Sequence, residues 1–450
     1  MEQLELHRFD GRPSFAQALP LALQHVVAMV AGCVTPALIV ANSAKLSSSD
    51  SVLLIQMSLI MAAISTLIQL YGFFRVGSKL PVIIGISFAY VPTMSAIALQ
   101  YTENVNGPYA IGVILGAQIV GSIFAILFGL FVKALMRLFP SIVSGTVVFV
   151  IGLSLYPIAV RYMGGAGSVT APNWGNPKNW TVAVITFAVG LLLNIFAKGI
   201  FKMASVLFAM VVGYLVAIPM GLINLEPVRQ ASWFAIASPL YFGLHFEPAV
   251  IVSFVILFIV NAIQAIGDFT STTVGGMDRE PSHEELQGGI VGYGVTNILG
   301  AFFGCLPSAT FSQNVGIVAV NKVVSRLVFV YASVIILLAG LLPKFSGLLR
   351  SIPFPVIGGA TISVFAMITM NGIRLIAKQP FTPRNVTIVG LSVAIGMGFT
   401  SVCAEAQAAG LRWLPSWLYT AIGTSPVVLA TIIAIILNLL MKETEKDRAQ

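Results

Sequence analysis

Charged residues are scarce in this sequence. Asp, Glu, Lys and Arg make up 9% of its 450 residues, whereas hydrophobic residues make up 57%. A soluble globular protein carries about 25% charged residues. Apolar stretches that approach the ~20 residues needed to span a membrane as a helix recur along nearly the whole chain. The composition therefore excludes a soluble domain and predicts an all-α polytopic membrane protein.

Cysteine is also rare. The three cysteines, Cys33, Cys305 and Cys403, lie within or beside apolar stretches and show neither a CxxC pair nor a Cys/His ligand spacing. Disulfide frameworks and zinc sites depend on such spacings. We therefore expect neither disulfides nor a metal site, and the sequence gives no sign of a cofactor.

Signatures of several enzyme classes are missing. The chain contains no HExxH, GxSxG or GxxxxGK[ST] motif. Its net charge of +8 could suit nucleic acid, but Lys and Arg occur one to three at a time between apolar spans, without a basic run. We expect neither an enzyme nor a nucleic-acid-binding protein. Without a nucleotide-binding module, active transport by this chain would draw on an ion gradient.

The apolar pattern predicts about fourteen transmembrane segments, of which the third and tenth are short and irregular. Their approximate bounds are 15–41, 51–73, 81–98, 109–134, 138–160, 180–197, 202–223, 248–271, 288–306, 307–322, 325–343, 353–377, 385–402 and 422–441.

The distribution of basic residues predicts the orientation of these segments. Of the 24 Lys and Arg, 17 lie in the termini and the even-numbered connections, and 7 lie on the opposite side. Basic residues accumulate on the cytoplasmic side of membrane proteins. We therefore expect both termini, with the tails 1–14 and 442–450, in the cytoplasm, and the protein in the cell (inner) membrane.

The fourteen segments divide into two sets of seven, which as repeats must have opposite orientations. Inverted repeats are typical of secondary transporters, whose substrate sites lie on broken helices near the membrane midplane. The third span of each half is interrupted, by Pro81, Gly85 and Pro92 in one case and by Pro307 and Gly316 in the other. Such a segment persists in the membrane only where it lines a protected cavity. We therefore expect the substrate site between these two segments.

Polar side chains gather in matching spans of the two halves. Gln24 and His25 lie in the first span, and Gln264 and Asp268 lie four residues apart on one face of the eighth. Asp268 is the only carboxylate well inside a predicted span. Because an intramembrane carboxylate is costly and commonly functional, we favour proton handling over a purely structural, hydrogen-bonded role. For His25 we favour the structural role over proton shuttling.

Amide and aromatic side chains are the candidates for ligand binding. An amide both donates and accepts, so Gln264 suits a heterocycle edge with N–H and C=O groups, although it could simply join two helices. Gln313 and Asn314 lie at the second break, where a half-helix starting near Asn314 would point free N–H groups into the cavity. Asn314 could instead only cap that helix. Gly316 would admit a flat ligand, and Phe88 could stack on one or serve as packing.

Four short motifs resemble those of a known transporter family. They are Leu23-Gln24-His25, Ser87-Phe88, Ile266-Gly267-Asp268 and Gln313-Asn314-x-Gly316, the last of which continues to Val324-Ser325-Arg326. Over about residues 12–440 the chain resembles the nucleobase–ascorbate transporters, also called nucleobase–cation symporters of the second type. The purine branch, which handles xanthine or uric acid, is the most similar.

This resemblance implies a fold and an activity. A core domain, 15–134 and 248–345, would move against a gate domain, 138–225 and 353–441, with short antiparallel strands breaking segments three and ten. The activity would be proton-coupled import of a purine nucleobase by a homodimer. Substrate-binding positions would be Phe88, Ala89, Gln264, Gln313, Asn314, Val315 and Gly316, and the positions for proton coupling or structural polar contacts would be Asp268, His25 and Gln24.

The chain departs from the family pattern at four positions. Gln264 stands where the family has a glutamate that binds the base and is tied to proton coupling. Tyr293 replaces an Asp or Asn, Ala89 replaces a residue that is polar in many xanthine carriers, and Asn321 replaces a threonine. These changes leave three alternatives open: an uncoupled nucleobase facilitator, an anion carrier of sulfate-permease-like architecture, and a membrane sensor that binds without transport.

Overall fold

The computed structural model describes residues 5–135, 140–235, 238–411 and 413–441. The predicted tail 442–450, residues 1–4 of the other tail and the start of the predicted gate domain at 138 lie outside the described residues. Within the described part, eight helices are long and apolar enough to cross a membrane. They are α2 (Phe15–Ser43), α3 (Ser48–Tyr71), α5 (Gly107–Leu130), α7 (Ser141–Met163), α8 (Pro177–Phe196), α12 (Pro248–Met277), α17 (Phe354–Ala377) and α18 (Pro383–Ala408).

Shorter and bent helices complete the bundle. Two pairs bend by 80° at a short break, and each pair could form one further span. They are α15 (Arg326–Gly340) with α16 (Pro343–Arg350), and Ser416–Gly423 with α20 (Pro426–Leu440). Further helices are α4 (Val91–Asn104), α6 (Val132–Leu135), α9 (Ile200–Met203), α10 (Ser205–Ala217), α11 (Glu226–Gln230), α13 (His283–Phe302) and α14 (Ser312–Asn321). A short 3-10 helix, η1 (Phe88–Tyr90), precedes α4.

Helix ends coincide with capping residues. Ser282 and Glu285 form a reciprocal capping box at the start of α13. The side chains of Asn106 and Thr382 accept hydrogen bonds from the first-turn amides of α5 and α18. Such contacts satisfy amides that have no acceptor within the helix. Local sequence therefore fixes where these long apolar helices begin.

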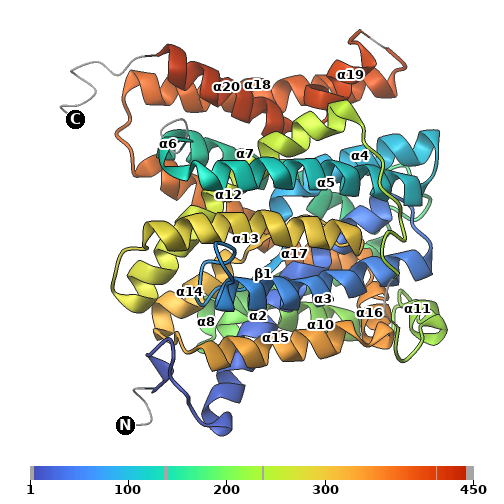
Figure 1. The fold of residues 1–450 in the computed structure, drawn as a ribbon. Helices are drawn as coiled ribbons and strands as arrows, with labels where there is room; N and C mark the ends of the chain where they lie inside the picture. Colours follow the sequence, from blue (N-terminus) through green and yellow to red (C-terminus); the bar gives the residue numbers. More distant parts are fainter. Residues whose placement is uncertain (1–4, 136–139, 236–237, 412, 442–450) are drawn as a thin grey trace.

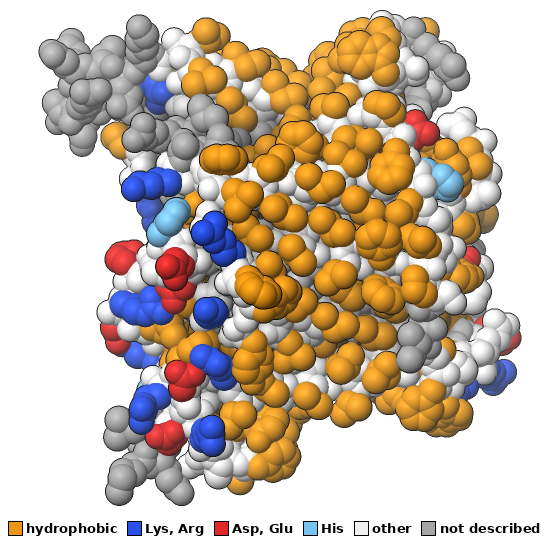
Figure 2. Space-filling model, viewed as in Figure 1, with side chains coloured by type: hydrophobic (Ala, Val, Ile, Leu, Met, Phe, Trp, Pro, Cys, Tyr) orange, Lys and Arg blue, Asp and Glu red, His pale blue; other side chains and the backbone are white. Residues whose placement is uncertain are grey.

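The molecular surface agrees with a membrane protein. Figure 2 shows a broad face of hydrophobic side chains, with most of the visible Lys, Arg, Asp and Glu gathered along the left edge. Large hydrophobic side chains such as Phe196, Leu215 and Leu439 are exposed on the helices. A continuous apolar surface of this kind requires a lipid or protein environment. The protein is therefore a multi-pass membrane protein.

The helices pack in two groups. Figure 1 shows the whole fold, with both groups in one view. One group contains α2, α3, α4, α5, α12, α13, α14 and α15, and the other contains α7, α8, α10, α17, α18 and α20. The most extensive contact is between α7 and α17 of the second group. Contacts between the groups are fewer, and include α10 with α2 and α12 with α20.

Two short strands lie at the centre of the first group. Strand β1 (Ile84–Ile86) pairs antiparallel with β2 (Ser308–Thr310), with Ile84 opposite Thr310 and Ile86 opposite Ser308. All six residues are buried. The pairing continues beyond the strands, because Ser87 donates its amide to Pro307 and Phe311 donates to Ile83, at 3.0 and 2.9 Å. The two broken segments thus satisfy each other's backbone hydrogen bonds. Non-helical backbone within a membrane protein needs such partners, because lipid offers none.

The Phe311 ring occupies a slot between two glycines. An ideal Cβ on Gly32 of α2 would lie 2.6 Å from Cε1 of the ring, and one on Gly85 of β1 would lie 2.2 Å from Cε2. Phe311 is the N-cap residue of α14 and is buried. The missing side chains at the two glycines therefore leave the space that this ring fills.

Candidate functional site

Helix α14 starts inside the protein, directly after β2. The sequence predicted a start near Asn314, but the helix begins at Ser312, with Phe311 as the N-cap residue. Asn314 is the third helical residue, so its predicted alternative role as the cap is wrong. The first amides of a helix have no acceptor within it. Those at the start of α14 bring partial positive charge to the two strands.

Phe88 and Gln313, which the sequence placed in one predicted site, line the same small cavity. Its volume is about 10 Å³, roughly the room that one water molecule needs. It is otherwise lined by Ala28, Ala31, Gly32, Thr35, Val206, Thr361 and Val364. Gln313 is exposed, and it makes no side-chain hydrogen bond with another described residue. The ring of Phe88 meets Phe365 of α17 edge-on, with centroids 5.4 Å apart. The cavity therefore lies where the two helix groups meet.

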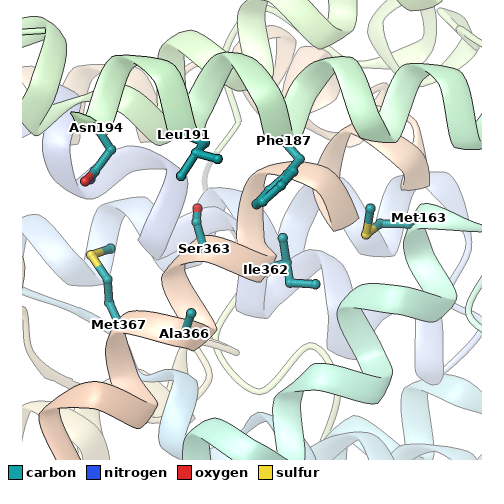
Figure 3. Close-up of a pocket in the computed structure, with 8 residues that line it drawn as sticks. All are labelled: Met163, Phe187, Leu191, Asn194, Ile362, Ser363, Ala366 and Met367. Carbon is teal, nitrogen blue, oxygen red and sulfur yellow. The ribbon is translucent and has the colours of Figure 1, made fainter. Parts of the chain in front are cut away.

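A larger hollow lies elsewhere, between α7, α8 and α17 (Figure 3). It holds about 450 Å³ and is lined by Met163, Phe187, Leu191, Asn194, Ile362, Ser363, Ala366 and Met367. None of the predicted site residues contributes to it. Its walls are almost entirely apolar and offer few groups to orient a polar ligand. We therefore place the candidate site at the smaller cavity, which combines a free amide, an aromatic ring and a helix start.

Asp268 ties α12 to the second break. Its carboxylate accepts hydrogen bonds from the hydroxyls of Thr310, at 2.5 Å, and Ser312, at 2.8 Å. No cation forms an ion pair with Asp268 among the described residues. The structural alternative to proton handling predicted contact with a neighbouring helix or with the backbone amides of the broken segment. Ser312 belongs to α14, so the contact with a neighbouring helix is present. It is made by side-chain hydroxyls rather than backbone amides, and the two hydroxyls bind both oxygens of the carboxylate.

His25 is paired with Asn314 in the buried interior. The Asn314 amide nitrogen lies 3.1 Å from Nδ1 of His25 and donates to the His25 carbonyl oxygen at 3.0 Å. The His25 ring packs against Phe329, with centroids 4.7 Å apart. Both side chains are about 1% exposed. This pair fixes α14 against α2, which is the structural role favoured for His25.

Gln24 connects three helices. Its amide oxygen accepts from Asn321 of α14 at 3.4 Å, and its nitrogen donates to the thioether sulfur of Met203 in α9. Gln24 does not line the small cavity. Met203 precedes α10, which packs with the second helix group. Gln24 is therefore a contact between the groups at one end of the site.

Gln264 remains available on α12. It is partly exposed, and its amide makes no hydrogen bond with another described side chain or backbone group. Gly267 and Gly316 are exposed on α12 and α14, and an ideal Cβ on either would meet nothing within 4 Å. Helix α12 packs against α14. Ala89 and Val315 are buried.

Several residues that build this site were not predicted from the sequence. Thr310 and Ser312 hold Asp268, and their hydroxyls flanking Phe311 were a visible signal. Asn297 of α13 accepts from the Ser308 amide at 2.8 Å and donates to the Ser308 carbonyl at 3.1 Å. An asparagine inside an apolar span was the signal for that contact. Tyr293, noted as a departure from the family pattern, pairs with the hydroxyl of Tyr90.

Comparisons with known proteins agree along nearly the whole chain. The family described as the Permease family matches residues 16–405. Xanthine permease XanP of Escherichia coli (strain K12) is 31% identical over 445 residues, covering 97% of this chain and 94% of its own. The Xanthine permease of Bacillus subtilis (strain 168) is 32% identical over 448 residues, covering 97% and 96%. Uric acid transporter UacT of E. coli (strain K12) is 32% identical over 440 residues, covering 95% and 89%.

Solved structures share the fold at low sequence identity. The transmembrane domain of the cyanobacterial bicarbonate transporter BicA aligns with a TM-score of 0.59 at 15% identity, covering 94% of this chain and 97% of its own. The murine anion transporter Slc26a9, in its inward-facing state, aligns with a TM-score of 0.61 at 11% identity, covering 95% and 68%. These likenesses concern the fold alone.

Proposed function

Because the chain belongs to this Permease family, we propose that it imports a purine nucleobase, such as xanthine or uric acid, together with protons across the cell membrane. It is a transporter rather than an enzyme. The observation that carries the choice of ligand is the joint placement of Phe88 and the free Gln313 amide on one cavity at the two helix breaks. Both termini would lie in the cytoplasm, and the working unit would be a homodimer.

The site offers a flat heterocycle complementary groups. Gln313 and Gln264 each present a donor and an acceptor, which suits the adjacent N–H and C=O groups of a purine lactam edge. The ring of Phe88 would stack on the base. The free amides at the start of α14 would favour a carbonyl oxygen, and Gly316 leaves room for the base to approach. Asn314, Val315 and Ala89 would hold this surface in place from behind.

Transport would follow from movement of one helix group against the other. We assign the first group, 15–134 and 248–345, to a core that carries the base, and the second, 138–225 and 353–441, to a gate. The whole would comprise 14 segments in two inverted repeats of seven. Two contacts would be broken and remade in each cycle, namely Phe88 with Phe365 and Gln24 with Met203. The paired breaks in corresponding segments support this arrangement.

Coupling to protons would rest on Asp268. Gln264 occupies the family's glutamate position, and its amide cannot titrate. Asp268 lies one helical turn further along α12 and bridges to both sides of Phe311. Protonation would leave this carboxyl with fewer acceptor positions for the two hydroxyls, and would loosen α12 from α14. An uncoupled facilitator is the alternative if Asp268 only holds the two elements together.

Uptake of radiolabelled xanthine, urate, guanine, hypoxanthine and uracil tests this proposal in cells that lack other nucleobase carriers. We expect accumulation of at least one purine, and loss of accumulation when a protonophore is added. Equilibration without accumulation would indicate a facilitator. Binding to the purified protein without uptake would indicate a sensor, and absence of both would refute nucleobase transport.

An anion carrier is the second candidate, because the structural neighbours include a bicarbonate and an anion transporter. The small cavity, as far as the described residues define it, is lined by no Lys, Arg or His. Labelled bicarbonate and sulfate belong in the same uptake experiment. Their transport in place of purines would favour the anion carrier.

A further inference from the structure

A buried chain of hydrogen bonds runs behind the Phe88 turn. The hydroxyls of Tyr90, which follows Phe88 by two residues, and Tyr293 of α13 are hydrogen-bonded to each other. Tyr90 is 0% exposed and Tyr293 is 2% exposed. The ring of Phe258 packs against both, with centroids 5.1 and 5.5 Å away. The aromatic surroundings keep water from replacing this contact.

Asn261 of α12 links the tyrosine pair to the turn. Its amide nitrogen donates to the Ser87 hydroxyl at 3.1 Å, and its side chain lies beside the Tyr90 hydroxyl. The Asn261 oxygen is buried and has no hydrogen-bond partner among the described residues. Asn261 therefore lies between the Ser87 hydroxyl, to which it is hydrogen-bonded, and the tyrosine pair.

The chain of contacts ends on the backbone that presents Phe88. The Ser87 hydroxyl accepts from the Ala89 amide at 3.2 Å, and the Ser87 amide donates to Pro307. Helix α13 holds the other break as well, because Asn297, one turn after Tyr293, binds Ser308 of β2. One helix outside the ligand cavity thus holds both breaks in position.

We propose that Tyr90, Asn261 and Tyr293 are positioning residues for the transported purine. They act through Ser87 on the turn that places the Phe88 ring against the ligand. This inference rests on the proposed function. Loss of either hydroxyl should loosen the Phe88 turn and weaken substrate binding, while the movement of the two helix groups continues.

The test is the kinetics of purine uptake by the full-length protein with Tyr90→Phe, Tyr293→Phe and both together. Each single change should raise KM about fivefold, the effect typical of one lost hydrogen bond, and leave the maximal rate per transporter nearly unchanged. Because the two hydroxyls act as one unit, the double variant should raise KM no further than either single variant. Tyr214→Phe is the matched control, since it loses a hydroxyl contact with Ser351 and neither residue lines the small cavity.

Several results would overturn the inference. They are an unchanged KM in both single variants, a loss confined to the maximal rate, or a double variant whose effect equals the product of the two single effects. If the phenylalanine variants do not reach the membrane, Asn261→Ser decides, because it shortens the link to Ser87 and leaves both tyrosines intact; an unchanged KM in that variant would overturn the inference. If the wild-type protein takes up no purine, the proposed function fails, whereas purine uptake with unchanged variants refutes the positioning role alone.

Discussion

Replacing Gly85 by alanine should destabilise the protein, because the Phe311 ring already fills the space that a side chain would need. The ideal Cβ would lie 2.2 Å from Cε2 of the ring, whereas ordinary van der Waals contact begins at 3.4 Å. The ring would therefore have to retreat by about 1.2 Å, the difference of these two distances. The ring is also confined on its other side, where an ideal Cβ on Gly32 would lie 2.6 Å from Cε1. Overpacking of this kind costs about 1–3 kcal/mol.

The measurement is thermal or denaturant unfolding of the purified protein in detergent, with Gly398→Ala as the matched control. An ideal Cβ on Gly398, in α18, meets nothing within 4 Å. Alanine is favoured over glycine in a helix by up to about 1 kcal/mol, so the control should be neutral or stabilising. If the two variants prove equally stable, the packing argument for the Phe311 slot is wrong.

The same substitution should also weaken uptake, because Phe311 is the N-cap residue of α14. A smaller side chain should relieve the overlap, so Phe311→Leu should recover part of the lost stability in the Gly85→Ala background. The two changes should then be non-additive, as expected for residues in contact. Strict additivity would show that alanine at 85 acts through something other than the ring.

Three further substitutions test the polar groups of the site. Asp268→Asn should lower uptake about tenfold or more, because hydrogen bonds to charged groups are strong, and should flatten its dependence on external pH; a normal pH profile would remove Asp268 from coupling. Gln264→Glu should change purine selectivity or the pH dependence of uptake, and an identical profile would assign Gln264 to helix packing. Asn314→Ala should lower the unfolding free energy by about 1–3 kcal/mol, since it leaves His25 without its buried partner; unchanged thermal stability would contradict this.

Sequence reasoning was successful where hydropathy and residue type suffice. Apolar runs predicted a polytopic helical protein, and the motifs around Asp268 and Gln313 predicted the family, which the comparisons confirm. Phe88 and Gln313 line one small cavity, and their role in binding a ligand stays a prediction. These successes have a common cause, because long apolar helices and short motifs are local properties of a sequence.

The failures concern contacts between distant segments. Nothing near Asp268 in the sequence names Thr310 and Ser312 as its partners. The fit of the Phe311 ring between Gly32 and Gly85 likewise joins residues that are far apart in the sequence. The Tyr90–Tyr293 pair also forms only in three dimensions, so Tyr293 could be identified in sequence as a departure but given no role.

The pairing of β1 with β2 has a consequence for biosynthesis. During synthesis, the first break enters the membrane long before its partner at Ser308–Thr310 has been made. Until then, the backbone N–H and C=O groups of β1 have no partner strand. The membrane interior supplies few other hydrogen-bonding groups to replace it. Pairing across such sequence separation is slow. We expect the amino-terminal half expressed alone to be degraded, and co-expression of the carboxyl-terminal half to rescue it by completing the strand pair.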